Sequence, residues 1–129
     1  MGLEPKLPAG VRVGVSPKKG RGIFATRDYA AGEVVEVVPV LVIPTAQQEI
    51  IVPTILNDYV FGWGDTVAIA FGYGSLYNHS WQPNCEYKKH LADLVIEFVA
   101  VRPIAAGEEI VTNYASSYPE KAGLWSELD

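Results

Sequence analysis

The chain alternates short apolar runs with turn-forming residues, a pattern typical of β-structure. Strand-like alternation predicts a strand at residues 11–15, and another short β-type run follows at 23–26. The run at 33–38 is dense in β-branched residues, which pack well on a pleated sheet. Turns at 18–22 and 28–32 separate these runs. The pattern therefore predicts short strands joined by tight turns.

The middle of the chain is less regular. Pro39 and Pro44 bracket a further apolar piece, after which residues 45–66 are interpreted as a variable insert. A helical turn opens at 45–49, and Pro53 breaks any continuation. A strand is predicted again at 67–71.

The last third of the chain returns to strand-like patterns. Strands are predicted at 86–90 and 93–100, and the second has apolar residues on both faces, so we expect both faces to be covered. A charged and then apolar run at 108–114 ends in a tyrosine. The tail from residue 116 predicts one short helix with its apolar residues on a single face.

One polar stretch, residues 74–85, interrupts the apolar pattern. Its Asn-His-Ser at 78–80 favours neither helix nor strand, because such short polar side chains bond to nearby backbone. Pro83 removes a backbone donor, so we expect an irregular loop. Tyr77 and Trp81 flank the tripeptide, and a surface turn has no need of two large aromatic side chains. This stretch is the first candidate for a functional site.

Composition narrows the class of protein. A length of 129 residues fits one domain, and a net charge of −5 argues against nucleic-acid binding and favours a cationic partner. The single cysteine, Cys85, excludes an internal disulfide, and the two histidines show no zinc-ligand spacing, so no metal is expected. Neither a secretory signal nor a membrane-length apolar run is visible. We expect an intracellular, reducing compartment, either cytoplasm or nucleus.

Several motifs are weak when they are taken singly. Residues 20–25 match the dinucleotide-binding pattern G-x-G-x-x-A, but no helix pattern follows, which argues against a dinucleotide site. Two interpretations of the glycines stay open: a plain hairpin turn, or a close approach of the backbone to a ligand. His79 alone is more often a hydrogen-bonded structural residue than a base. Ser80 lacks the flanks of a nucleophilic serine, and Tyr114 alone reads as an aromatic residue at a strand end.

Three stretches follow one another along the chain: Lys-Gly-Arg-Gly-Ile-Phe at 19–24, Asn-His-Ser-Trp-Gln-Pro-Asn-Cys at 78–85, and Gly-Glu-Glu-Ile-Val-Thr-Asn-Tyr at 107–114. Together they resemble the SET-domain family of protein-lysine methyltransferases, and the middle stretch is the most specific. The resemblance implies a mostly β SET fold of several short sheets, with short helices and a threaded, pseudoknot-like C-terminal segment. It also implies a single domain over residues 1–129, with a core at about 11–115 and a tail at 116–129.

The resemblance implies S-adenosyl-L-methionine as cofactor and Tyr114 as the catalytic residue beside the transferring methyl group. The first stretch would hold the methionine part of the cofactor, and the second its adenine and ammonium ends. The implied cofactor-binding residues are Gly20, Arg21, Gly22, Asn78, His79 and Tyr114.

Methyl transfer to lysine needs alignment of donor and acceptor and a neutral amine. A free lysine has a pKa near 10.4, and an aromatic, poorly hydrated channel lowers it. Tyr77 and Tyr87 are the candidates for the walls of that substrate channel.

Departures from the family pattern are informative. Trp81 stands where many members carry a zinc-binding cysteine, and the tail has no cysteine, so the zinc site is not expected. Thr112 lies where an aromatic residue often controls how many methyl groups are added, which leaves the product open. The helix predicted in the tail, through Leu124, Trp125 and Leu128, is interpreted as an apolar lid over the channel.

The resemblance leads to two functional hypotheses. The first is an enzyme that methylates a lysine of a protein, such as one on a histone-like basic tail, which the acidic surface attracts. The alternative is a catalytically silent SET fold that binds a peptide or the cofactor without turnover. Neither involves a membrane. The small domain has little surface for closing its own cleft, which favours a homodimer, although no motif requires one.

Overall fold

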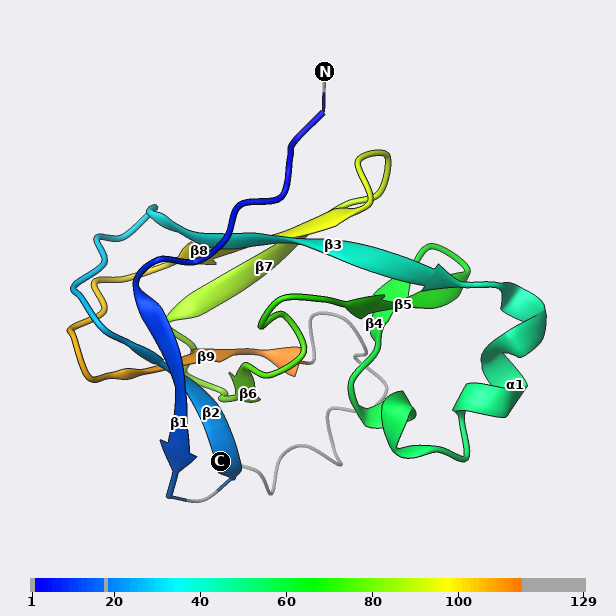
Figure 1. Cartoon of the computed structure of the whole chain (residues 1–129), viewed down its shortest axis with the longest axis horizontal. Helices are drawn as coiled ribbons and strands as arrows, with labels where there is room; N and C mark the ends of the chain where they lie inside the picture. The colour runs from blue at the N-terminus through cyan, green and yellow to red at the C-terminus, as the bar shows by residue number, and fades with distance from the viewer. Residues whose placement is uncertain (1, 18, 115–129) are drawn as a thin grey trace.

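The computed structural model describes residues 2–17 and 19–114, and this part of the chain is built mostly of strands in two sheets (Figure 1). The strands are β1 (Val11–Ser16), β2 (Gly20–Ala25), β3 (Val34–Ile43), β4 (Phe61–Trp63), β5 (Thr66–Ala70), β6 (Asn78–His79), β7 (Cys85–His90), β8 (Val95–Ala100) and β9 (Glu109–Thr112). The helical turns are η1 (Thr45–Gln47), α1 (Gln48–Ile51) and η2 (Ile55–Asp58). The expected mostly β fold is confirmed.

The five-stranded sheet has the order β4-β5-β3-β8-β7, and all its pairs are antiparallel. Its long member, β3, runs through Pro39, whereas the sequence suggested two separate apolar pieces on either side of that proline. Pro39 lies opposite Val95 in the β3–β8 register. A proline is tolerated in a strand where its missing N–H is not needed by the ladder.

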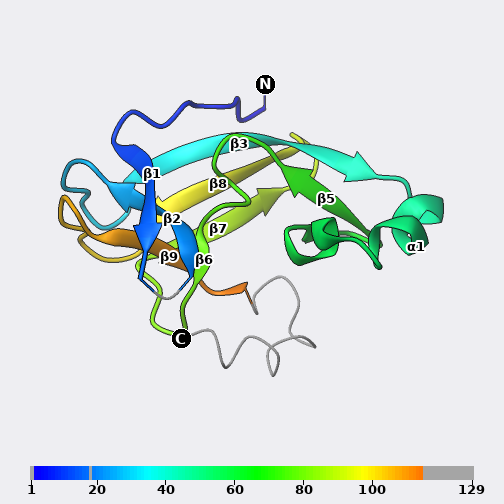
Figure 2. The ribbon, with the colours of Figure 1, turned by 60° about the horizontal axis from the view of Figure 1, so that its bottom comes forward.

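The four-stranded sheet has the order β1-β2-β9-β6 and carries all three sequence motifs. Strands β1 and β2 form the hairpin that the glycine-rich turn predicted. Strand β9 pairs antiparallel with β2 and parallel with β6, so it lies between segments from the start and the middle of the chain (Figure 2). Strand β9 is therefore paired with segments that carry the first and the middle motif, whereas the threading that the resemblance implied stays a prediction.

The apolar core lies where these two sheets face each other and continues under the loop that precedes β6. Strand β8 has both faces covered, as its sequence predicted, since all its residues are buried except Glu97, which is half-buried. The buried cluster includes Ile23, Tyr29, Val38, Trp63, Tyr77, Ile96, Phe98, Ile104 and Ile110.

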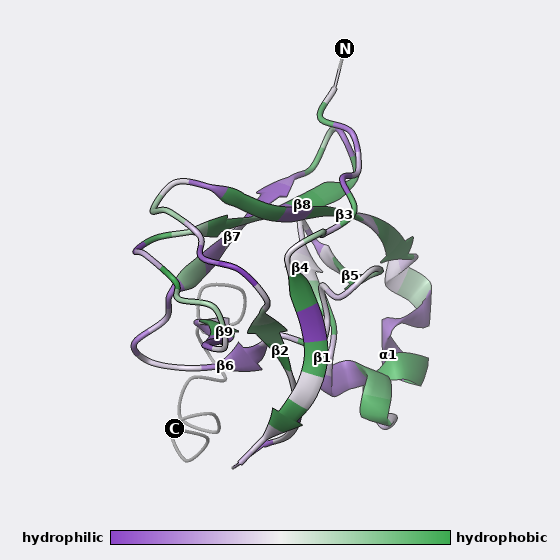
Figure 3. Ribbon diagram, turned by 60° about the vertical axis from the view of Figure 1, so that its left-hand side comes forward, coloured by the Kyte–Doolittle hydropathy of each residue, from purple (hydrophilic) through white to green (hydrophobic). Residues whose placement is uncertain are grey.

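The insert contains the predicted helical turn, and the helix ends at Ile51, before Pro53. The short strand β4 at the end of the insert was not predicted. No residue of α1 is buried, and the ribbon of α1 in Figure 3 carries both hydrophobic and hydrophilic colours. The predicted C-terminal helix lies outside the described residues.

Candidate active site

Asn84 fastens the polar loop to the last strand. Its side-chain N–H donates to the Glu109 carbonyl at 2.8 Å, and its side-chain oxygen accepts from the Val111 N–H at 2.9 Å. Its own carbonyl accepts from the Val101 N–H at 2.9 Å. Because Asn84 is buried, these bonds replace its contacts with water. The sequence motif contained Asn84, but no role was assigned to it.

Asn78 joins the other two motifs at one amide. Its Nδ2 donates to the Arg21 carbonyl and to Glu109 Oε2, each at 2.8 Å, and Ser16 donates to Glu109 Oε1 at 2.9 Å. Both N–H groups of the amide therefore have partners within the protein. The remaining polar atom of this side chain, its oxygen, can only accept hydrogen bonds.

The two glycines of the first motif serve different purposes. At Gly22 a Cβ atom would lie 2.4 Å from Glu109 Oε2 and 2.8 Å from Asn78 Nδ2, so the Asn78–Glu109 contact has room only beside glycine. Gly20 has φ +80°, and nothing lies within 4 Å of its Cβ position. The hairpin turn and the close approach are both present, and the group that approaches Gly22 is part of the protein itself.

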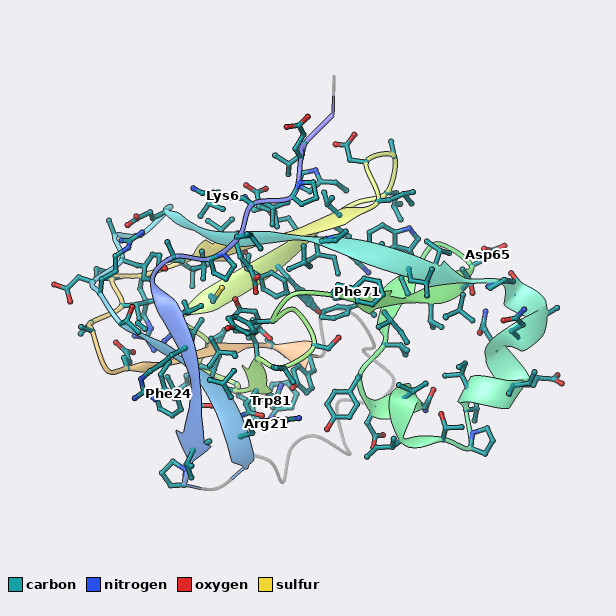
Figure 4. All side chains as sticks on the ribbon, in the orientation of Figure 1. Lys6, Arg21, Phe24, Asp65, Phe71 and Trp81 are labelled. Carbon is teal, nitrogen blue, oxygen red and sulfur yellow. The ribbon has the colours of Figure 1, made fainter. Side chains whose placement is uncertain are left out.

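Arg21 and Trp81 come from β2 and from the loop after β6, and Figure 4 shows their side chains in the same lower part of the molecule. The Trp81 ring meets the His79 ring edge to face, with centroids 4.3 Å apart. The aromatic residue after Asn-His-Ser therefore packs against that motif.

Tyr114 is held at both its main chain and its hydroxyl. Its N–H donates to His79 Nδ1 at 3.0 Å, and its hydroxyl donates to the Tyr77 carbonyl at 2.6 Å. Burial raises the pKa of Tyr114, and the neighbouring Tyr59, Tyr87 and Glu109 raise it further. The phenol therefore stays protonated at neutral pH, with its proton directed at a carbonyl.

His79 acts here as a positioning residue. It is buried, and its Nδ1 accepts the Tyr114 N–H, so a neutral ring carries its proton on the other nitrogen. Its carbonyl accepts from the Lys19 ammonium of the first motif. The side chain thus fixes the strand end that carries Tyr114, and the main chain faces the first motif.

The two proposed channel tyrosines have different surroundings. Tyr87 is half-buried, its hydroxyl lies 3.5 Å from the Tyr114 carbonyl, and its ring packs edge-on against Phe61 with centroids 5.0 Å apart. The Tyr77 ring is only 1% exposed and stacks on Phe98 at 4.5 Å. The prediction of Tyr77 as a channel wall is therefore corrected: its ring belongs to the core, and its carbonyl reaches the site.

Tyr59, at the end of η2, was missed by the sequence reasoning. Its phenol lies close enough to Tyr114 to raise the pKa of that residue, and it is partly exposed. The sequence shows only an isolated tyrosine within the insert, and no motif around it indicates a functional role. The structure thus brings three tyrosines from the insert, β7 and the end of β9 together.

A pocket of about 350 Å³ lies against the motifs. Its lining residues are Lys19, His79, Ser80, Gln82, Asn84, Arg102, Glu108, Glu109 and Val111. Both signs of charge line it. Of the predicted cofactor-binding residues, only His79 lines this pocket, whereas Gly20, Arg21, Gly22, Asn78 and Tyr114 do not. Within residues 2–17 and 19–114, no group of three or more His, Cys, Asp or Glu side chains is placed to hold a metal ion. No helix in this part of the chain is long and apolar enough to cross a membrane.

Comparison with known proteins agrees with the geometry. Residues 20–115 match the family model of the SET domain. A Schizosaccharomyces pombe histone-lysine N-methyltransferase, specific for H3 lysine-37, is 30% identical over 125 residues, which cover 95% of this chain and 81% of that protein. A solved structure from Plasmodium falciparum, described as a histone methyltransferase, has a TM-score of 0.72 and 26% identity, and the match covers 87% of this chain and 98% of that one.

Proposed function

The chain belongs to the SET-domain family, and from this premise we propose that it is a protein-lysine N-methyltransferase that uses S-adenosyl-L-methionine. One observation carries the proposal: segments far apart in sequence meet at the Asn-His-Ser motif. The Asn78 amide donates to the Arg21 carbonyl, the Tyr114 phenol donates to the carbonyl of the neighbouring Tyr77, and β6 pairs with β9. Such convergence supports a cofactor site beside a reacting group.

The residues present fit the proposed cofactor. The pocket of about 350 Å³ is lined by His79 and Lys19 but not by Asn78 or residues 20–22, so the cofactor is assigned to those residues and not to the pocket. The Asn78 oxygen and the His79 carbonyl offer acceptors, and Lys19 and Arg21 offer cations for a carboxylate. When bound, S-adenosyl-L-methionine supplies a methyl group on a positively charged sulfur. We assign its binding to the backbone of 20–22, to Asn78 and to His79.

Tyr114 is the proposed catalytic residue, and its contacts define what it can do. Its hydroxyl donates a hydrogen bond to the Tyr77 carbonyl, so the lone pairs of the phenol oxygen can accept a hydrogen bond from a neighbouring amine. Since burial raises the pKa of Tyr114, the phenol orients the lysine as a hydrogen-bond acceptor and does not act as a base. The lysine must lose its proton by another route, and the aromatic surroundings favour the neutral amine.

The proposed substrate is a lysine on a basic protein segment. Support comes from the net charge of −5, which attracts a cationic partner, and from the S. pombe relative, which is a histone-lysine methyltransferase. Tyr87 and Tyr59 are the proposed walls of the lysine channel. A nuclear or cytoplasmic location follows from such a substrate. The lid through Leu124, Trp125 and Leu128 and a homodimer both stay predictions.

Incubation with methyl-labelled cofactor and a panel of basic peptides tests the proposal. Label should appear on lysine, and Tyr87→Ala should weaken peptide use, whereas Tyr87→Phe, which keeps the ring, should retain most of it. Cofactor binding by calorimetry without any transfer would instead favour the silent binding module. Unchanged peptide affinity and turnover in Tyr87→Ala would remove Tyr87 from the channel.

A further inference from the structure

Glu36 is a buried acidic residue that the proposed reaction leaves without a role. It lies on β3, where the pairing with β8 shifts register between Val34 and Glu36, and its side chain is 1% exposed. A register shift of this kind redirects the neighbouring side chains. A buried carboxyl group is costly unless its oxygens are hydrogen-bonded, so its partners show what it holds in place.

The partners of Glu36 all belong to the loop that leads into the Asn-His-Ser motif. The Tyr77 hydroxyl donates to Glu36 Oε1 at 2.6 Å. The Tyr73 backbone also contributes a hydrogen bond, which counteracts the rise in the Glu36 pKa that burial causes. At Gly72, with φ +60°, a Cβ atom would lie only 3.0 Å from Glu36 Oε2. The loop 71–77 is thus packed directly around this carboxyl group.

The contacts continue from Glu36 to the proposed catalytic phenol. The Tyr77 ring is fixed on one side by stacking on Phe98, with centroids 4.5 Å apart, and at its end by Glu36. The carbonyl of the same residue accepts the Tyr114 hydroxyl at 2.6 Å. One residue therefore connects the buried carboxyl group to the hydroxyl that faces the amine.

We propose that Glu36 is a positioning residue for methyl transfer: by anchoring Tyr77, it fixes the carbonyl that orients the Tyr114 hydroxyl. The effect on catalysis rests on the proposed function, whereas the effect on the surroundings of Tyr114 does not. Small errors in the placement of a reacting group lower the rate strongly while leaving substrate binding nearly intact. Disturbing this anchor should therefore change kcat more than KM.

Two variants and one control separate positioning from general destabilisation. Tyr77→Phe removes only the hydroxyl that Glu36 binds and keeps the carbonyl. Glu36→Gln keeps the shape of the side chain and one acceptor oxygen, so its effects should be smaller than those of Tyr77→Phe. Ile104→Val is the control. It deletes one methyl group from a buried residue beside Tyr29 and so lowers the stability of the protein, but Ile104 makes none of the hydrogen bonds between Glu36, Tyr77 and Tyr114.

Two readouts are measured on each variant. The first is steady-state methyl transfer, in which Tyr77→Phe should lower kcat about tenfold with KM for peptide and cofactor nearly unchanged. The second is the 13Cζ resonance of Tyr114 in tyrosine-labelled protein, identified by its absence in Tyr114→Phe. That signal should shift in Tyr77→Phe, shift less in Glu36→Gln and stay in place in Ile104→Val.

The two readouts fail independently. A Tyr114 resonance and a kcat that both stay unchanged in Tyr77→Phe overturn the positioning role, whatever the activity of the wild type. If the Tyr114 resonance shifts in Tyr77→Phe but the wild-type protein transfers no methyl group, the anchoring by Glu36 is supported and the proposed function is rejected. If Tyr77→Phe does not fold, Glu36→Gln decides, because an amide is a weaker acceptor than a carboxylate and must still shift the signal.

Discussion

The sheet that carries the motifs and the helical part of the insert, residues 45–59, are held in contrasting ways. In the sheet, Asn78 and Asn84 make side-chain hydrogen bonds to residues more than twenty positions away. In the insert, none of the three helical turns has a buried residue, and Ile50 and Ile55 are 67% and 71% exposed. Figures 1 and 2 show α1 at the far end of the molecule from β1 and β2.

This difference shows which residues the fold itself constrains. Bonds such as those of Asn84 need one amide in one place, so few other residues can replace it. Exposed apolar side chains on a short helical turn make no such demand on the rest of the chain. The substitutions below test whether the two regions respond as differently as their contacts indicate.

The largest effect is expected from Tyr114→Phe. Removing the hydroxyl takes away the group that orients the amine, and losses of this kind lower kcat by about 10²–10³-fold. The phenylalanine ring fills the same space, but the Tyr77 carbonyl loses its hydrogen bond, so the free energy of unfolding should fall by about 1–3 kcal/mol. Methyl transfer and thermal unfolding measure the two effects. Wild-type turnover in this variant would show that the phenol has no part in the reaction.

Asn84→Ala should cause the largest loss of stability. It leaves the Val111 N–H and the Glu109 carbonyl without their partner, and each lost bond with a stranded group costs about 1–3 kcal/mol. We expect a total near 2–4 kcal/mol in urea unfolding. Gln82→Ala, an exposed amide two residues earlier, is the control and should be neutral. Equal behaviour of the two variants would mean that Asn84 does not fasten β9.

Gly22→Ala should cost less, about 1–3 kcal/mol, because the added methyl group overlaps Glu109 and Asn78. It should also weaken binding of S-adenosyl-L-methionine in calorimetry, since Asn78 must move. Gly20→Ala is the comparison, because its Cβ would meet nothing and only the left-handed backbone opposes it, at about 1 kcal/mol. If Gly22→Ala bound the cofactor as well as Gly20→Ala, the close packing around Asn78 would be irrelevant to the site.

The same contrast separates what the sequence could predict from what it could not. Strands such as β1, β5 and β8 were located. The motifs also predicted Asn78 and Tyr114 as site residues, and these roles stay predictions. The two-residue strand β6 is too short for any periodicity, and its parallel pairing with β9 depends on the whole fold. The sequence therefore predicted a loop where β6 lies, although the order of the motifs predicted that this stretch lies beside the last motif.

Residues whose role depends on a distant partner were missed or misplaced. Glu36 looked like one polar position in a valine-rich strand, because its contact with Tyr77 spans 41 positions. For the same reason, the Tyr77 ring was placed in the channel although it lies in the core. Tyr59 has no motif around it, so only the folded chain shows its closeness to Tyr114.

The buried carboxyl group of Glu36, on β3, should make the free energy of unfolding depend on pH. Burial raises the pKa of Glu36, and the bonds from Tyr77 and Tyr73 lower it only in part. Its contribution to stability is therefore fully present below the unfolded pKa of about 4.3 and is lost as pH rises through the folded pKa. The difference in unfolding free energy, wild type minus Glu36→Gln, should fall across this window in urea titrations. A difference that rises with pH would contradict the raised pKa.

The smallest effect is expected in the insert, from Ile50→Ser combined with Ile55→Ser. Both side chains are mostly in water already, so their removal takes away little buried area and should change the unfolding free energy by no more than about 0.5 kcal/mol. Ile96→Val, which deletes one methyl group from a fully buried position, should cost more, about 0.5–1.5 kcal/mol. Urea unfolding of the two variants places them on one scale. If the double serine variant lost more unfolding free energy than Ile96→Val, the two isoleucines would be packed against the rest of the chain. If it kept its stability but changed KM for the peptide, those isoleucines would contact the substrate directly.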